Sequence, residues 1–283
     1  MIAMVFEILE FGFMQRALIA GVAVAITASV IGLFLVLRRN SLFGDALSHV
    51  AFGGIALGLF VNVYPLWTGL VLSVLGALGI TKLRQSTKIP ADATVAILLS
   101  SGLALGTILV SLSGGWTLNL FSFLFGSILL VSINDTLTIL AMAGIILALV
   151  ILLYRKLMYM AFDEEQAKVS GLPISNLNYL FVVLAGLAVI VSMRLVGILL
   201  VSSLIVIPNV TALLFGKGFK KTALISVGIS IFSVITGIIV SFASNLAPSG
   251  TIVVVLIAVF LVTLAARFSA KKQAAEKLEE ARS

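Results

Sequence analysis

Apolar segments long enough to cross a bilayer recur along this 283-residue chain and constrain its fold more than any other feature. A helix needs about 20 residues to cross the hydrocarbon core. The sequence therefore predicts an all-α polytopic membrane protein with about nine spanning helices, and about eight to ten as the range. We expect the spans near residues 14–37, 41–61, 64–84, 90–112, 133–154, 177–193, 196–215, 221–243 and 250–268.

The composition supports this prediction, because only 10% of the residues are charged and 61% are hydrophobic, whereas soluble domains carry about a quarter charged residues. We expect one transmembrane domain over residues 1–268 and a charged cytoplasmic tail over 269–283. The apolar piece at 120–131 is too short to span comfortably and is typical of a re-entrant or interfacial half-helix. The first apolar segment is too long for the core of a signal peptide, so we expect it to be retained.

The positive charges predict the orientation of the chain. With the N-terminus outside and the C-terminus in the cytoplasm, all but Arg16 and Arg194 of the 18 Lys and Arg residues lie on the cytoplasmic side. Cytoplasmic loops of membrane proteins show this excess. Although the net charge is +7, the charges lie in short gaps between spans and form no basic face, so we expect no nucleic-acid partner.

The longest polar connection, at about 155–178, contains a short stretch with the signals of a surface helix. Its core is residues 162–173, with the sequence FDEEQAKVSGLP. An acidic first turn, an apolar pair and a closing Gly and Pro are typical of a helix that starts and stops within the loop. The orientation places this helix in the cytoplasm.

Acidic residues are rare, and their positions single out one of them. Of the 11 Asp and Glu residues, all but Asp45, Asp92 and Asp135 lie before the first span, in the 155–178 connection or in the tail. Asp92 and Asp135 stand at predicted helix starts, where a carboxylate meets the positive end of the helix dipole. Asp45 has no such explanation.

Asp45 and His49, the sole histidine of the chain, are one helical turn apart on the same face of a predicted span, with Ser48 beside them. Ionisable groups inside a membrane span are costly and are usually functional. A carboxylate and an imidazole suit zinc or manganese. The pair could instead hydrogen-bond to lock two helices together. Two ligands do not enclose a metal, whereas a symmetric dimer would bring four together.

Pro208, followed by Asn209, interrupts the apolar run at 196–215. Proline bends a helix and frees a carbonyl, so this site predicts either a kink that lines the transport pathway or a purely structural one. The chain has no nucleotide-binding motif and no cysteine for a thiolate metal site.

Two segments resemble the manganese/zinc/iron permease family of ATP-binding-cassette importers. Residues 38–49 (RRNSLFGDALSH) are similar to the family signature, and residues 162–173 are similar to its cytoplasmic coupling segment. Residues 13–17, 125–128 and 248–251 add to the likeness, which extends from about residue 13 to 268.

The resemblance implies a homodimer with the fold of type II importers, two cytosolic ATPase subunits, and an extracellular metal-binding protein that delivers the metal. It places the metal path at Asp45 and His49. The residues it assigns to ATPase coupling are Asp163, Glu164, Glu165, Ala167 and Gly171. Family members often have Pro-Ala-Ala or Pro-Ala-Ser where this chain has Pro208-Asn209-Val210, so that site departs from the family pattern.

We therefore predict the permease subunit of an ATP-driven divalent metal importer in a prokaryotic cell membrane, with no permanently bound cofactor and ATP held by the partner. Details of the motifs favour zinc, with manganese next. The alternative is an ion-coupled secondary transporter or channel that uses Asp45 and His49 as a proton relay. Secondary carriers often show repeated halves, and the sequence has no convincing repeat. A membrane enzyme would need a second acid–base cluster.

Overall fold

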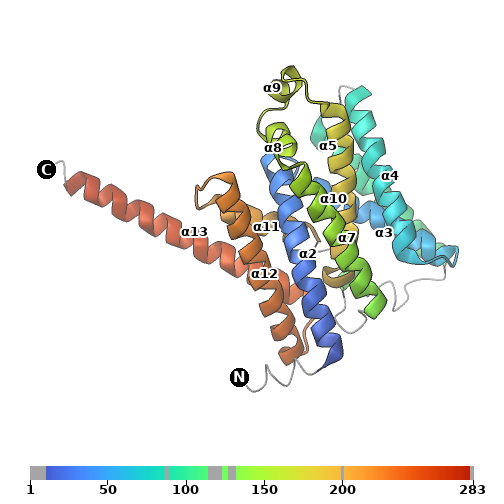
Figure 1. The fold of residues 1–283 in the computed structure, drawn as a ribbon. Coiled ribbons are helices and arrows are strands. Elements are labelled where there is room, and N and C mark those ends of the chain that lie inside the picture. The colour runs from blue at the N-terminus through green and yellow to red at the C-terminus, as the bar shows by residue number, and fades with distance from the viewer. Residues whose placement is uncertain (1–10, 87–88, 114–122, 127–131, 199–200, 281–283) are drawn as a thin grey trace.

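The computed structural model describes residues 11–86, 89–113, 123–126, 132–198 and 201–280, and they confirm an all-helical membrane protein (Figure 1). Eight of its helices are long and apolar enough to cross a bilayer. The long helices are α2 (Gly12–Leu37), α3 (Phe43–Phe60), α4 (Pro65–Ser86), α5 (Ala91–Leu112), α7 (Ile133–Leu152), α10 (Ile174–Val196), α12 (Phe219–Ser244) and α13 (Pro248–Glu280).

The predicted span at 196–215 is a shorter helix, α11 (Val201–Leu213). Its neighbour α10 continues to Val196 and stops at Gly197, whose φ of 80° is accessible mainly to glycine. The predicted half-helix at 120–131 lies mostly outside the described residues. The described part, 123–126, has a second positive-φ glycine, Gly126, whose backbone lies directly against that of Gly197.

Small residues let the central helices approach closely. A Cβ atom at Gly54 of α3 would lie 2.6 Å from the Cα of Gly69 in α4, and one at Gly102 of α5 would lie 2.7 Å from the carbonyl oxygen of His49. In a membrane, such contacts supply packing energy that the hydrophobic effect cannot supply between helices. The helix that carries Asp45 is therefore clamped between α4 and α5.

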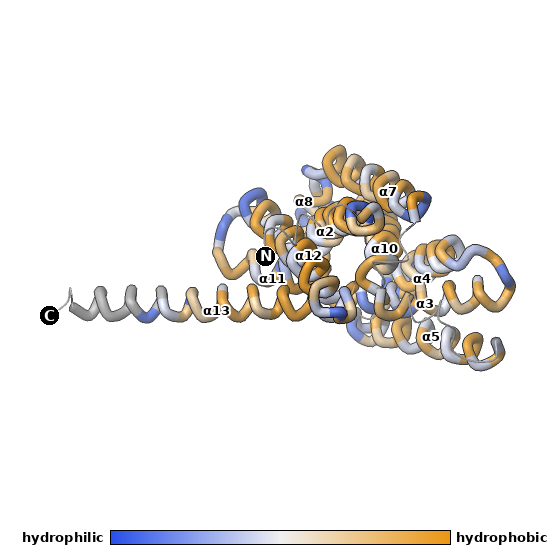
Figure 2. Tube along the Cα trace, turned by 90° about the horizontal axis from the view of Figure 1, so that it is seen from below, coloured by the Kyte–Doolittle hydropathy of each residue, from blue (hydrophilic) through white to orange (hydrophobic). Residues whose placement is uncertain are grey.

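The helices differ in how much of their surface the protein covers. In the apolar windows of α2 and α3, 72% of the residues are buried, against 22% in α13. Figure 2 shows the mainly hydrophobic bundle end-on, with α13 running out from it to one side. The helix α13 continues to Glu280, so much of the segment expected as a charged tail is helical.

The connection at 155–178 is more ordered than a polar loop. It contains an unpredicted amphipathic helix, α8 (Tyr154–Phe162), which buries Leu157 and Met160, and the predicted surface helix, α9 (Glu164–Val169). The side chain of Asp163 caps α9 by accepting a hydrogen bond from the backbone N–H of Gln166, at 2.8 Å.

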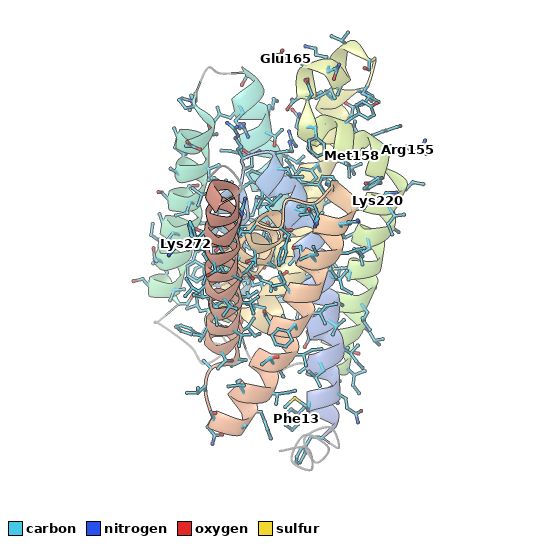
Figure 3. All side chains as sticks on the ribbon, turned by 90° about the vertical axis from the view of Figure 1, so that its left-hand side faces the viewer. Phe13, Arg155, Met158, Glu165, Lys220 and Lys272 are labelled. Carbon is cyan, nitrogen blue, oxygen red and sulfur yellow. The ribbon has the colours of Figure 1, made fainter. Side chains whose placement is uncertain are left out.

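The two ends of the bundle carry different residues. Figure 3 shows Glu165, Arg155 and Lys220 towards one end and Phe13 at the other. Arg38 and Arg84, from two connections expected in the cytoplasm, line the same cavity as Glu164 of α9. These connections therefore lie at the same end of the bundle, as the charge pattern predicts. That this end faces the cytoplasm stays a prediction.

Candidate metal path and its links to the coupling helix

Asp45 and His49 lie in the first two turns of α3. The Asp45 Oδ1 atom is 3.9 Å from the Nε2 atom of His49, and the side chains are 26% and 14% exposed. That distance is too long for a hydrogen bond, so the structure does not show the pair as a hydrogen-bonded lock. Asp45 stands in the first turn of α3, where a carboxylate meets the positive end of the helix dipole. The sequence-based expectation that Asp45, unlike Asp92 and Asp135, has no such position was therefore wrong.

The backbone behind this pair is held by α5. A Cβ at Gly102 would lie 2.6 Å from the nitrogen of Val50, so α5 touches the α3 backbone at this level. Ser48, predicted beside the pair, is fully buried and donates its hydroxyl to the carbonyl of Asp45 at 2.7 Å. Its hydroxyl therefore serves the helix itself in this structure.

Asp45 and His49 do not make a complete metal site within one chain. Among the described residues, no group of three or more His, Cys, Asp or Glu side chains could hold a metal ion. The Nδ1 atom of His49 is buried and has no hydrogen-bond partner among those residues. Whether this pair takes part in metal transport is therefore a question for the proposal below.

Asn209, which follows Pro208 at the predicted kink, lies in a separate polar cluster. It is fully buried, donates from Nδ2 to the carbonyl of Ile205, and accepts at Oδ1 from the hydroxyl of Ser226, each at 2.7 Å. The Ser226 hydroxyl is also 2.7 Å from that of Ser29. This cluster joins α2, α11 and α12 next to the Pro208 position, and none of its described bonds reaches Asp45 or His49.

Sequence reasoning missed both serines of this cluster. The signal was present in α12, where the buried serines Ser226, Ser230 and Ser233 follow a helical period. Serine is common enough in membrane helices that this pattern alone does not reveal a partner.

The predicted coupling segment has one side exposed to solvent and one side packed on the bundle. Glu165 is exposed at the tip of the molecule (Figure 3), whereas Ala167 is fully buried and anchors α9 to the bundle. Gly171, with a φ of 79° and open space around it, ends the segment. Glu164 turns inward, and its Oε2 atom lies 3.3 Å from the Nη2 atom of Arg38.

Arg38 is the centre of this inward contact, and the sequence did not single it out for this role. Its Nη2 also donates to Oδ1 of Asn178 at 2.6 Å, and Asn178 donates to Oε1 of Glu164 at 3.1 Å. Burial lowers the pKa of the Arg38 guanidinium below its ordinary value, while the charge and hydrogen bond of Glu164 oppose that shift. The group lines a cavity of about 210 Å³ with Arg84.

At the opposite end of the bundle, the structure confirms the predicted position of Asp135 at the start of a helix. Ser132 and Asp135 form a reciprocal capping box at the N-terminus of α7. The hydroxyl of Tyr64, in the turn that follows α3, donates to Oδ1 of Asp135 at 3.1 Å. The far end of α3 is thus linked to α7. Asp92 also lies in the first turn of its helix, α5.

Comparison with known proteins places these features in a family. Residues 10–267 match the model of the ABC 3 transport family. The chain belongs to this family. It is therefore a multi-pass membrane permease of a bacterial ATP-binding-cassette metal importer, and the ATPase is a separate subunit.

Relatives and a solved structure agree with that assignment over more than nine-tenths of the chain. The permease is 31% identical to the manganese transport system membrane protein MntC of Halalkalibacterium halodurans, covering 94% of this chain and 90% of the relative. It is 32% identical to the manganese import system permease protein ScaB of Streptococcus parasanguinis, covering 95% and 94%.

Among solved structures, PsaBC from Streptococcus pneumoniae in complex with Fab has a chain that is 32% identical to this permease. The two superpose with a TM-score of 0.84 over 93% of this chain and 95% of that one. The ABC 3 permease fold is therefore shown for this chain.

Proposed function

We propose that this permease imports a divalent transition metal, with manganese as the first candidate, along a path lined by Asp45 and His49. The observation that carries the proposal is the partly exposed pair on α3, with 3.9 Å between carboxylate and imidazole. Oxygen and nitrogen donors one turn apart suit manganese or zinc better than calcium or magnesium.

The choice of manganese departs from the sequence-based preference for zinc. The relatives MntC and ScaB are named for manganese, and nothing in these comparisons supports zinc. Zinc remains the second candidate because imidazole is one of its preferred ligands.

We further propose that two copies of the permease form the path. One copy offers two ligands, both partly exposed, so a two-fold axis next to α3 would bring four ligands together. A transport site must also release its ion, and ligands divided between two movable chains suit weak, transient binding.

In this proposal, the end of the bundle that carries α9 faces the cytoplasm, where α9 contacts the ATPase. The exposed Asp163 and Glu165 are available to that partner, and Gly171 gives the turn that returns the chain to α10. An extracellular metal-binding protein would deliver the ion at the opposite end, near the Tyr64 and Asp135 contact.

The test is uptake of labelled Mn²⁺ and Zn²⁺ into vesicles that contain the permease and its cognate ATPase, with and without ATP. Asp45→Asn and His49→Gln should each reduce ATP-dependent uptake at least about tenfold. Mutating even a residue that only hydrogen-bonds to a metal ligand typically lowers metal affinity or activity by about 10–100-fold. Asp92→Asn is the matched control, because that acid is exposed in the first turn of α5.

Two results would count against the proposal. Wild-type uptake in both variants would remove Asp45 and His49 from the path. Uptake without the ATPase, driven by a proton gradient alone, would favour the ion-coupled secondary transporter instead.

A further inference from the structure

The two glutamates at the start of α9 point to different surroundings. Glu165 is exposed at the tip of the molecule (Figure 3). Glu164 reaches back to the bundle and pairs with Arg38, with 3.3 Å between Oε2 and Nη2. Two adjacent side chains of one short helix therefore point in different directions, Glu165 towards solvent and Glu164 towards the membrane helices.

Arg38 occupies the turn between α2 and α3. It is the first residue after α2, and α3 begins only a few residues later, at Phe43. Backbone bonds make this turn tight: the N–H of Asn40 donates to the carbonyl of Leu35 at 2.9 Å, and that of Phe43 to the carbonyl of Asn40 at 3.0 Å. A displacement of Arg38 is therefore passed to the start of the helix that carries Asp45.

A third helix braces this contact. Asn178 of α10 accepts from Arg38 at 2.6 Å and donates to Glu164 at 3.1 Å, so the three polar groups form a closed triangle. The guanidinium carbon of Arg38 also lies 5.5 Å from the ring centroid of Phe181, a distance within cation–π range.

Because Arg38 is mostly buried, we expect this triangle to contribute more free energy than a surface ion pair does. Its side chain is 12% exposed, against 52% for that of Glu164. Exposed pairs contribute little because water replaces them readily. The guanidinium of Arg38 is largely desolvated, so losing both acceptors at Glu164 and Asn178 costs more than losing an exposed pair.

We infer that Arg38 and Glu164 are positioning residues that transmit movement of the coupling helix α9 to α3, and so to the metal path at Asp45 and His49. This inference rests on the proposed function, because it assigns a route to the coupling between ATPase and permease. In this role the connection stays closed during transport, and α9 and the turn at Arg38 move together.

The first test separates coupling from folding and assembly. Manganese uptake and ATP hydrolysis are measured in the same vesicles, which contain the full permease with its ATPase, and the ratio of the two rates is the readout. Arg38→Gln and Glu164→Gln should lower this ratio about tenfold, within the range of coupling between distant sites, while ATP hydrolysis with the Arg38→Gln permease stays within about twofold of wild type. Arg39→Gln is the matched control, because it removes the same charge from the exposed neighbouring residue.

The second test restores the connection by covalent means. The chain has no cysteine, so the pair Arg38→Cys and Glu164→Cys can be labelled without background from other residues of the permease. The reduced double variant should be uncoupled like the single variants. A short bifunctional thiol reagent that joins the two positions should bring the ratio back to within about twofold of wild type, whereas a monofunctional reagent should not.

The outcomes separate the two proposals. If the wild-type protein shows no ATP-dependent uptake, the proposed function fails. If the wild type transports and Arg38→Gln keeps the wild-type ratio, the transmission role is overturned and the proposed function stands. The same holds if the cross-linked pair remains uncoupled, because a contact that must open during transport cannot be the rigid connection inferred here.

Discussion

Replacing Gly102 of α5 by alanine should displace α3, the helix that carries Asp45 and His49. Glycine has no side chain that could bind a metal, so any effect must come from packing. The added Cβ would lie 2.6 Å from the nitrogen of Val50 and 2.7 Å from the carbonyl carbon and oxygen of His49. These are backbone atoms of a helix and cannot rotate away. Ordinary contact starts at 3.4 Å, so α5 and α3 must separate by about 0.8 Å at this level.

The cost of that separation is an overpacking penalty of about 1–3 kcal/mol. For a chain of this size, this corresponds to a fall in Tm of roughly 2–12 °C, taking about 2–4 °C per kcal/mol. The measurement is thermal unfolding of the purified permease in one detergent, paired with ATP-dependent manganese uptake. We expect both to fall, because the displaced backbone is that of His49.

Gly144→Ala in α7 is the matched control. A Cβ there would meet nothing within 4 Å, and alanine is the better helix former by about 1 kcal/mol, so its Tm should be unchanged or slightly higher. Equal stability of Gly102→Ala and Gly144→Ala would refute the argument that close approach of α5 positions the backbone at His49.

Two further predictions concern the polar links. Ser226→Ala should lower unfolding stability by about 1–3 kcal/mol, because it leaves the buried Oδ1 of Asn209 and the hydroxyl of Ser29 without their shared partner; a Tm equal to wild type in the same detergent assay would contradict this. Tyr64→Phe removes one hydrogen bond to the Asp135 carboxylate and should cost about 1.5–3 kcal/mol. Phe is otherwise isosteric with Tyr, so a loss outside that range in the same assay would show that the contact has a different role.

Much of the candidate site follows from local sequence patterns. Asp45 and His49 stand out because ionisable residues are rare in membrane spans. The surface helix α9 could be predicted because the residues that start and stop it lie within or next to it. The capping role of Asp135 follows from the same local chemistry. Each of these features depends on neighbours within one or two helical turns, which the order of residues specifies directly.

Other features depend on segments that are distant in the sequence. Nothing near Arg38 indicates that its partners are Glu164 and Asn178, and nothing near Asn209 indicates Ser226 and Ser29. The length of α11 was also overestimated from the sequence, where the apolar run predicts a full span. In the structure, the segment that holds α11 lies between two glycines with positive φ, Gly197 and Gly216.

By itself, the sequence determined that this chain lies in a membrane as a helical bundle, that its basic connections alternate with connections that carry few positive charges, and that one helical face carries the carboxylate and the sole imidazole. These follow from hydropathy, charge and the helical period. Only the tertiary structure decided which of the two neighbouring acids of α9 turns inward, and that α3 is clamped at Gly54 and Gly102. Close approach and burial depend on how helices pack against one another, and packing is a property of surfaces assembled from the whole chain.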